Sequence, residues 1–295
     1  MSGYNAGVAV SSRTSPSLLT LPVNGIELAV WDWPGSGPPL LFAHATGFHA
    51  RCWDQIDRAF PDRRAIAVDL RGHGRSSKPA PPYYWIDFAA DLAAAAESLG
   101  IVECIGVGHS MGGHTLAATV ARRPETCAKL LLIDPTIFPR KYYGQPAGDS
   151  SYIARRRNRF SSPEEMYQRF QDRPPFVTWQ PEVLHDYCEY GLLAADDGYV
   201  LACPPEVEAA IYPMSVDPGS DIYDLLPLVR QPVTVLRAGI QWVPGVFNLN
   251  SSPTAPDLAS HFPDGRDIVL EGRGHYIPME APQLVVDAIR RVESE

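Results

Sequence analysis

The sequence of 295 residues predicts an α/β fold: a mostly parallel, doubly wound sheet interrupted by one largely helical insertion. Two observations support this fold class. Short apolar runs alternate with helical patterns up to residue 134 and again after residue 229, as in parallel sheets covered on both faces. Between these parts, residues 135–228 are polar, aromatic and rich in proline. We therefore expect a core domain of residues 1–134 and 229–295, with residues 135–228 inserted into it.

The elements of the core follow one another in a regular order. Apolar, β-branched runs predict strands at residues 26–33, 40–43, 65–69, 101–107, 129–134, 233–237 and 268–270. Helical patterns fall between them, at residues 52–60, 88–99, 114–121 and 282–292. Within the insertion, residues 163–171 and 182–193 have helical patterns.

Charge and hydropathy exclude several classes of protein. Lys and Arg number 25 against 34 Asp and Glu, and a net charge of −9 argues against nucleic acid or an anionic membrane as a main partner. No run of about 18 apolar residues is present, so no membrane-spanning helix is expected. The first residues lack a basic start followed by an apolar stretch, so we expect no signal peptide and a cytoplasmic location. No pattern indicates an oligomeric state.

Cysteine usage argues against a disulfide framework and against a zinc site. The five cysteines are odd in number and show no C-x-x-C spacing, and Cys104 and Cys127 lie in or beside apolar runs. No phosphate-binding glycine loop or metal-ligand cluster is evident. We therefore expect no cofactor and no metal.

The strongest local motif is Gly108-His109-Ser110-Met111-Gly112-Gly113, between the predicted strand 101–107 and a helix. In a G-x-S-x-G motif the serine occupies a sharp, strained turn from strand to helix, which exposes its hydroxyl above the sheet. The start of the following helix favours negative charge there. Ser110 is therefore the candidate nucleophile.

With this motif the chain resembles the α/β-hydrolase family over nearly its whole length. The segment Asp69-Leu70-Arg71-Gly72-His73-Gly74-Arg75-Ser76 resembles that family's turn after the fourth strand, and His44-Ala45-Thr46-Gly47-Phe48 resembles its oxyanion loop. The resemblance implies a serine hydrolase whose insertion is a cap over the nucleophile. It also implies that the backbone N–H groups of Met111 and Thr46 form the oxyanion hole, although Ala45 stands where many relatives have glycine.

Among the eight histidines, His275 is the candidate general base. It lies in Gly272-Arg273-Gly274-His275-Tyr276-Ile277-Pro278, after the last apolar strand and before the last helix. The resemblance places the base at this position, and the order of serine before histidine agrees. His275 would accept the serine proton and later return it to the leaving group.

The acid of the expected triad departs from the family pattern. In most relatives it follows the strand that corresponds to residues 233–237, but residues 237–245 contain no Asp or Glu. Asp134 ends the strand before the insertion, where certain haloalkane dehalogenases and a lactone hydrolase carry their acid. Since imidazole needs a carboxylate to fix its tautomer, we predict Asp134 as the acid. The alternatives are later carboxylates, namely Asp257, Asp264 and Asp267.

The insertion is rich in aromatic residues, and some of them should face Ser110 in a mostly apolar pocket. Candidate pocket residues are His109, Phe48, Trp242, Tyr143 and Trp179. We expect hydrolysis of a carboxylic ester or lactone of a small to medium, partly hydrophobic substrate through an acyl-enzyme. Hydrolysis of an amide or carbon–carbon bond on the same triad remains an alternative, as does a ligand-binding or signalling protein with weak turnover.

Overall fold

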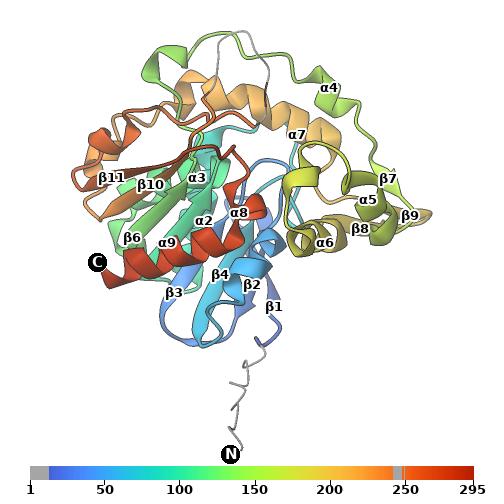
Figure 1. The fold of residues 1–295 in the computed structure, drawn as a ribbon, viewed down its shortest axis with the longest axis horizontal. Helices are drawn as coiled ribbons and strands as arrows, with labels where there is room; N and C mark the ends of the chain where they lie inside the picture. The colour runs from blue at the N-terminus through green and yellow to red at the C-terminus, as the bar shows by residue number, and fades with distance from the viewer. Residues whose placement is uncertain (1–12, 242–247, 249) are drawn as a thin grey trace, which may run out of the picture.

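An eight-stranded sheet forms the centre of the molecule in a computed structural model that describes residues 13–241, 248 and 250–295. The strand order is β1-β2-β4-β3-β5-β6-β10-β11 (Figure 1). From β4 to β11 all neighbours pair in parallel, whereas β2 is antiparallel to both β1 and β4. This mostly parallel sheet confirms the predicted fold class. The strands are β1 (Ser17–Val23), β2 (Ile26–Trp33), β3 (Ser36–Ala43), β4 (Arg63–Asp69), β5 (Cys104–His109), β6 (Cys127–Ile133), β10 (Val233–Ala238) and β11 (Gly265–Leu270).

Strand β1 is the core strand that the sequence analysis did not predict. It pairs with β2 through a tight hairpin at Asn24 and Gly25, which have φ values of 46° and 77°. Asn-Gly is the sequence most typical of a two-residue hairpin turn, because both positions tolerate positive φ. This dipeptide was therefore an available signal for β1.

Helices cover both faces of the sheet, as expected for a doubly wound fold. They are α1 (Asp54–Asp57), α2 (Trp85–Ser98), α3 (Met111–Arg122), α8 (Ile277–Glu280) and α9 (Pro282–Ser294), with short 3-10 turns at η1 (Ala50–Trp53), η2 (Pro124–Thr126) and η8 (Leu258–His261). The predicted helix at 52–60 is shorter than expected: a 3-10 turn precedes α1, and Pro61 disfavours helical backbone at Phe60.

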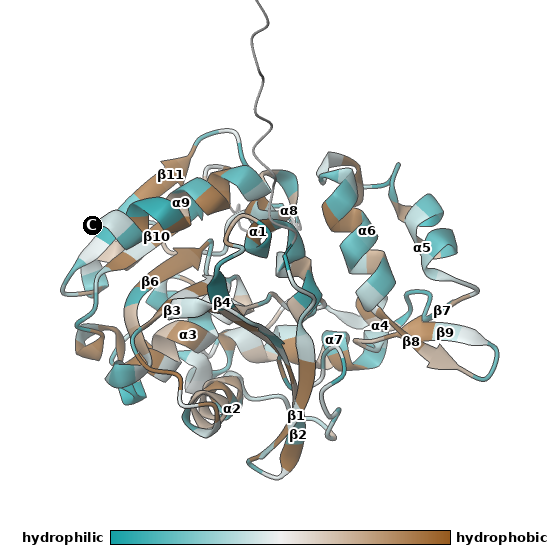
Figure 2. Ribbon diagram, turned by 90° about the horizontal axis from the view of Figure 1, so that it is seen from below, coloured by the Kyte–Doolittle hydropathy of each residue, from teal (hydrophilic) through white to brown (hydrophobic). Residues whose placement is uncertain are grey.

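Alternation along the strands divides the core into two layers. In β3, Leu41 packs with residues of α2 and α3 such as Phe88, whereas Phe42 packs on the opposite face with residues of α1 and α9 such as Ile289. Successive side chains of a strand point to opposite faces, so a strand buried on both sides is apolar throughout. Figure 2 shows these hydrophobic strands between α9 on one side and α2 with α3 on the other.

The segment between β6 and β10 carries the inserted elements. Its helices are α4 (Ser151–Ala154), α5 (Pro163–Phe170), α6 (Pro181–Tyr190) and α7 (Pro205–Ile211), with 3-10 turns at η3 (Arg140–Tyr142), η4 (Phe176–Thr178), η5 (Tyr212–Val216), η6 (Pro218–Ser220) and η7 (Leu226–Leu228). It also contains a small antiparallel sheet, in the order β7 (Arg159–Phe160), β9 (Gly198–Leu201) and β8 (Leu192–Ala195). The boundaries 135–228 of the cap stay a prediction.

The small sheet was not predicted, and it corrects the expected helix at 182–193. Helix α6 ends at Tyr190, and Leu192 already belongs to β8. Strands of two to four residues have too few positions to show an alternating pattern.

None of the helices in the described ranges is long and apolar enough to cross a membrane. Within the same ranges no three His, Cys, Asp or Glu side chains gather as a metal site would require. All five cysteines are buried and free of disulfides.

Candidate active site

Ser110 lies in a sharp turn between β5 and α3, with φ 57° and ψ −119°. Two glycines make this turn possible. A Cβ atom on Gly108 would lie 2.5 Å from the backbone oxygen of Gly112, and a Cβ atom on Gly112 would lie 2.1 Å from that of Ala43. Such a strained backbone costs about 1–3 kcal/mol and is characteristic of functional sites. The two glycines of the G-x-S-x-G motif are thus required because the backbone at Gly108, Gly112 and Ala43 approaches too closely for a side chain.

His275 is hydrogen bonded on both ring nitrogens. Its Nε2 atom lies 2.9 Å from Ser110 Oγ, and its Nδ1 atom lies 2.6 Å from Asp134 Oδ2. An ionised carboxylate can only accept a hydrogen bond, so Nδ1 carries the proton and Nε2 is left to accept the serine hydroxyl. The backbone of His275 is fixed as well: its N–H donates to the Asn250 carbonyl at 2.9 Å, and its carbonyl accepts from His109 Nε2 at 2.8 Å. The structure therefore brings the predicted nucleophile, base and acid into one hydrogen-bonded chain.

Asp134 follows β6 and is fully buried. Burial opposes ionisation of this carboxyl, but hydrogen bonds and charge interaction from His275, with further hydrogen bonds from Ser252 and the Ala238 N–H, hold its pKa below the usual range. The Ala238 N–H donates to Oδ1 at 2.9 Å. Ala238 is the last residue of β10, the strand after which most relatives carry their acid. Here this strand instead donates a hydrogen bond to the carboxylate of Asp134, which directly follows the neighbouring strand β6.

The later carboxylates lie in other interactions. The exposed Asp257 contacts the half-buried His261 at 3.5 Å, and Asp267 pairs with Arg237 at 2.7 Å. Asp264 immediately precedes β11, and its carbonyl accepts the Val233 N–H. Of the four candidates, the structure brings Asp134 into contact with His275.

Three hydroxyl groups at the site were not found from the sequence. Ser252 Oγ and Thr254 Oγ1 lie 2.5 Å and 3.2 Å from Asp134 Oδ1, and Thr136 Oγ1 lies 2.9 Å from Ser110 Oγ. Serine and threonine are common on loops and belong to no motif here. No sequence signal distinguished these three residues.

The predicted oxyanion donors lie side by side. Met111 is the first residue of α3, where backbone N–H groups have no partner within the helix. Thr46 lines the cavity beside Ser110, and its hydroxyl contacts Met111 Sδ at 3.3 Å. An oxyanion hole needs N–H donors at this side of the nucleophile. The donor roles of Met111 and Thr46 stay predictions.

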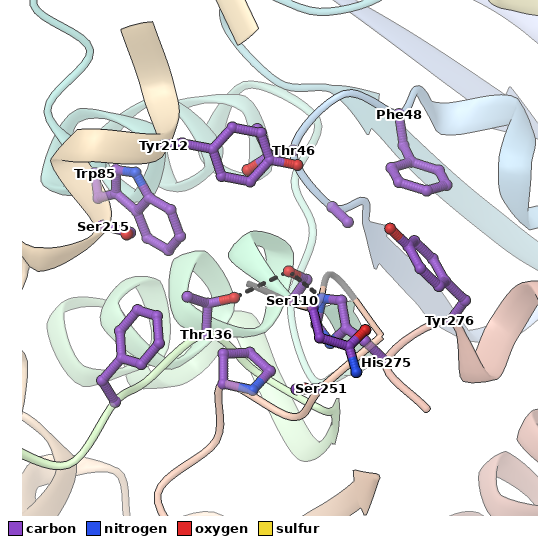
Figure 3. Close-up of a pocket in the computed structure, with 14 residues that line it drawn as sticks. Thr46, Phe48, Trp85, Ser110, Thr136, Tyr212, Ser215, Ser251, His275 and Tyr276 are labelled. Carbon is purple, nitrogen blue, oxygen red and sulfur yellow. Dashed lines mark hydrogen bonds between the residues drawn. The ribbon is translucent and has the colours of Figure 1, made fainter. Parts of the chain in front are cut away.

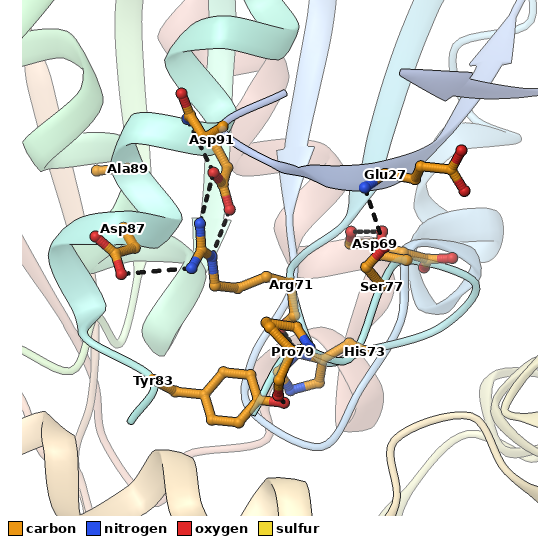
Figure 4. Close-up of polar contacts among 12 residues, drawn as sticks. Glu27, Asp69, Arg71, His73, Ser77, Pro79, Tyr83, Asp87, Ala89 and Asp91 are labelled. Carbon is orange, nitrogen blue, oxygen red and sulfur yellow. Dashed lines mark hydrogen bonds and ion pairs between the residues drawn. The ribbon is translucent and has the colours of Figure 1, made fainter. Parts of the chain in front are cut away.

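The turn after β4 supports the loop that carries Thr46. His73 Nδ1 donates to the Arg71 carbonyl at 2.9 Å, so its Nε2 accepts the Gly47 N–H at 3.0 Å. Burial lowers the pKa of His73 to about 3, so the ring stays neutral and keeps an acceptor nitrogen. Arg71 is anchored in turn by two hydrogen bonds to Asp91 of α2, at 2.6 Å and 2.8 Å (Figure 4). Through the hydrogen bond from the Gly47 N–H to His73, the segment Asp69–Ser76 therefore holds the predicted oxyanion loop in place.

A cavity of about 200 Å³ opens over Ser110 and His275 (Figure 3). Its walls are mostly aromatic and aliphatic, with a few hydroxyl and amide groups. The lining residues are Ala45, Thr46, Phe48, Trp85, Ser110, Thr136, Phe138, Tyr212, Ser215, Asn248, Ser251, Pro253, His275 and Tyr276. Among these described residues there is no Lys, Arg, Asp or Glu.

Of the predicted pocket residues, Phe48 lines the cavity. Trp179 stacks on Phe48, with 5.6 Å between the ring centroids. His109 is buried and packs edge-on against the Phe48 ring, and its Nε2 atom is hydrogen bonded to the His275 carbonyl. Tyr143 packs edge-on against Tyr223, at 6.4 Å. These three side chains are not among the residues that line the cavity. Trp242 lies outside the described residues.

Comparison with known proteins agrees with this geometry. A sequence model described as the alpha/beta hydrolase family matches residues 40–288, which include the strands from β4 to β11, the turn at Ser110 and the loop of His275. The chain belongs to the alpha/beta hydrolase family. Its resemblance at the sequence motifs is thereby confirmed at the level of the family.

Several members of the alpha/beta hydrolase family show how far the similarity extends. A 2-(acetamidomethylene)succinate hydrolase from Mesorhizobium japonicum is 25% identical over 262 residues, which are 86% of this chain and 87% of that protein. A non-heme chloroperoxidase from Streptomyces lividans is 38% identical, but over 114 residues that are 37% of this chain and 41% of that protein. For this relative and several others, the matching region thus spans less than half of the relative's own length.

Solved structures of alpha/beta hydrolases superpose over almost the whole chain. The crystal structure of E-2-(acetamidomethylene)succinate hydrolase covers 95% of this chain and 100% of its own, with a TM-score of 0.76 at 23% identity. A thermophilic esterase from Thermogutta terrifontis covers 93% and 97%, with a TM-score of 0.66 at 26% identity. At 23% identity, the similarity to the E-2-(acetamidomethylene)succinate hydrolase structure establishes the fold alone.

Proposed function

We propose that this alpha/beta hydrolase cleaves a carboxylic ester or lactone with a short, uncharged acyl group, through an acyl-enzyme on Ser110. The observation that carries the proposal is the chain from Ser110 Oγ through His275 to Asp134, at 2.9 Å and 2.6 Å, at the floor of an apolar cavity. Ser-His-Asp in this arrangement activates a serine for attack on an acyl carbon.

In the first half-reaction, His275 Nε2 takes the hydroxyl proton as Ser110 Oγ attacks the substrate carbonyl carbon. The carbonyl oxygen becomes an oxyanion, which the N–H groups of Met111 and Thr46 stabilise. The Asp134 carboxylate stabilises the imidazolium that forms. His275 then gives the proton to the departing alkoxide, and the acyl group remains on Ser110.

In the second half-reaction, water takes the place of the alcohol. His275 accepts a proton from the water as it attacks the acyl carbon, and then returns that proton to Ser110 Oγ as the ester bond to the enzyme breaks. The products are the carboxylic acid and the free enzyme. A lactone gives one product that carries both the acid and the alcohol.

The cavity favours a short and uncharged acyl group. Its volume of about 200 Å³ is smaller than the roughly 300–1,000 Å³ typical of ligand pockets, which argues for a short chain. Arg156 interacts electrostatically with Tyr212 on the wall, but it forms an ion pair with the buried Glu208, which offsets its charge. A substrate carboxylate in this cavity would lose its hydration without gaining a cationic partner, at a cost of several kcal/mol.

This proposed preference differs from the activity in the name of one relative, a hydrolase of 2-(acetamidomethylene)succinate. Two substrates separate the alternatives: methyl butyrate, which is uncharged, and monomethyl succinate, which carries a carboxylate. We expect kcat/KM to be at least about 10-fold higher for methyl butyrate, measured by titration of the released acid. Equal or faster hydrolysis of monomethyl succinate would contradict the uncharged class.

Ser110→Ala is the matched control for the nucleophile, because it removes one oxygen atom at the floor of the cavity. We expect this variant to lose turnover of both methyl esters while it keeps its melting temperature. Full activity of a folded Ser110→Ala protein would disprove the acyl-enzyme route, whichever substrate is preferred.

A further inference from the structure

The hydroxyl of Ser110 has a second neighbour besides His275. Thr136 Oγ1 lies 2.9 Å from Ser110 Oγ, the same distance as His275 Nε2, and both contacts are drawn in Figure 3. Thr136 is 7% exposed and lines the cavity, so its hydroxyl lies at the boundary between the nucleophile and the space for the substrate.

The direction of this hydrogen bond follows from counting protons. His275 Nδ1 carries the proton that faces Asp134, so Nε2 is an acceptor and must receive the Ser110 proton. Ser110 Oγ has one proton, which is thereby used. The contact with Thr136 then requires that Thr136 donates its own proton to a lone pair of Ser110 Oγ.

The backbone holds Thr136 in place against the nucleophile. The Thr136 N–H donates to the Ser110 carbonyl at 3.0 Å, and the Ser110 N–H donates to the Ile133 carbonyl at 3.0 Å. Between these residues, the Asp134 N–H donates to Leu236 at 2.8 Å, and Thr254 Oγ1 donates to the Pro135 carbonyl at 2.7 Å. The Thr136 hydroxyl is therefore positioned by the same segment that positions the acid, and the donor is oriented before substrate arrives.

We propose that Thr136 is a catalytic residue that donates a hydrogen bond to Ser110 Oγ in both half-reactions. The proposal rests on the acyl-enzyme function proposed above. In the free enzyme the bond directs the Ser110 proton towards His275. In the acyl-enzyme Oγ is an ester oxygen, which accepts hydrogen bonds weakly.

During deacylation the bond between Oγ and the acyl carbon breaks, and its electron pair goes to Oγ. His275 transfers its Nε2 proton to Oγ, while Thr136 keeps its own proton and donates a hydrogen bond throughout. This hydrogen bond strengthens as Oγ gains negative charge. An interaction that is stronger in the transition state than in the ground state raises the rate of the chemical step. Hydrogen bonds to charged groups correspond to about 10- to 100-fold in rate.

Two substitutions separate the hydroxyl from the methyl group of Thr136. Thr136→Val keeps the shape and removes the O–H, whereas Thr136→Ser keeps the O–H and removes the methyl. We expect Thr136→Val to slow both the burst phase and the steady-state phase of p-nitrophenyl acetate hydrolysis by about 10- to 100-fold, with KM changed less than about threefold. Thr136→Ser should stay within about fivefold of the unmodified protein in both phases.

A control makes the same chemical change elsewhere. Thr115 lies on α3, and its buried hydroxyl has no partner among the described residues. Thr115→Val should therefore keep both kinetic phases. Thr136→Ala also removes the O–H but places no new methyl group against Oγ, so it should lose as much activity as Thr136→Val. If the valine variant fails to fold, Thr136→Ala tests the proposal in its place.

Unchanged burst and steady-state rates in Thr136→Val would overturn the proposal. An equal loss in Thr136→Ser would also overturn it, because packing of the methyl group would then explain the effect. Ser110→Ala is measured alongside: if it stays active, the acyl-enzyme function itself is wrong. If Ser110→Ala is inactive while Thr136→Val is fully active, the role of Thr136 alone is wrong.

Discussion

Mild acid should destabilise the protein strongly, because five of its eight histidines are buried as neutral rings. Burial lowers the pKa to about 3 for His44, His73 and His109, and to about 4 for His49 and His114. An unfolded histidine has a pKa of about 6.5. Between these values the unfolded chain binds protons that the folded protein does not, so acid favours unfolding.

The magnitude follows from the pKa differences. Lowering the pH from 7 to 5.5 costs roughly 1.2 kcal/mol of stability for each of the five histidines. Carboxyls act in the opposite direction, because burial raises the pKa of Asp54 and Glu208, and raises that of Asp57 and the half-buried Asp186 to about 6. Asp57 and Asp186 each gain a proton in the folded state and return roughly 0.8 kcal/mol. The net loss from the histidines and these two carboxyls is about 4 kcal/mol, which is close to the lower end of the free energy of unfolding of many proteins, about 5–15 kcal/mol.

Urea unfolding at pH 7.0, 6.25 and 5.5 measures this loss directly. His114→Gln supplies a matched variant: His114 Nε2 contacts the Ser220 carbonyl at 3.0 Å, and the Gln amide can make the same bond without titrating. In this variant the difference in unfolding free energy between pH 7.0 and 5.5 should shrink by about 1.2 kcal/mol. A difference below about 1 kcal/mol in the unmodified protein, or an unchanged difference in His114→Gln, would refute the reasoning.

Three further changes test separate parts of the site. Asp134→Asn should lower kcat by about 10⁴-fold with little change in melting temperature, whereas Asp257→Asn should stay within about twofold; the reverse result would move the acid to the later loop. Gly112→Ala should lower the yield of folded protein, since its Cβ would lie 2.1 Å from the Ala43 oxygen, whereas Gly148→Ala, with nothing within 4 Å, should purify normally. Glu208→Gln should raise kcat/KM for monomethyl succinate relative to methyl butyrate by several-fold, because Arg156 loses its buried counter-charge. An unchanged ratio would show that Arg156 does not influence the cavity.

Much of the fold could be predicted from the sequence because it depends on local patterns. Most core strands contain a buried apolar run, so their positions followed from composition, and the turn at Ser110 followed from two glycines that sterics require. Asp134 could be proposed because the usual position after β10 contains no carboxylate, and because parallel strands end at one edge of the sheet.

The rest depended on contacts between residues far apart in sequence. Ser252 and Thr254 bind Asp134 from 118 and 120 positions away, and no pattern of serine or threonine foretells such a contact. An aromatic residue of the insertion can pack in its core or face the cavity, and Trp179 stacks behind Phe48 because the chain returns there. The hydroxyl of Thr136 reaches Ser110 only because β5 and β6 pair in the observed register.

The central claim is that Ser110, activated by His275 and Asp134, is the residue that becomes acylated. Its most direct test is mass-spectrometric mapping of the protein after reaction with a fluorophosphonate. The account predicts one adduct per chain, on the peptide that contains Ser110, with labelling slowed by Asp134→Asn. Modification of a different residue, or an active protein that remains unlabelled, would contradict it.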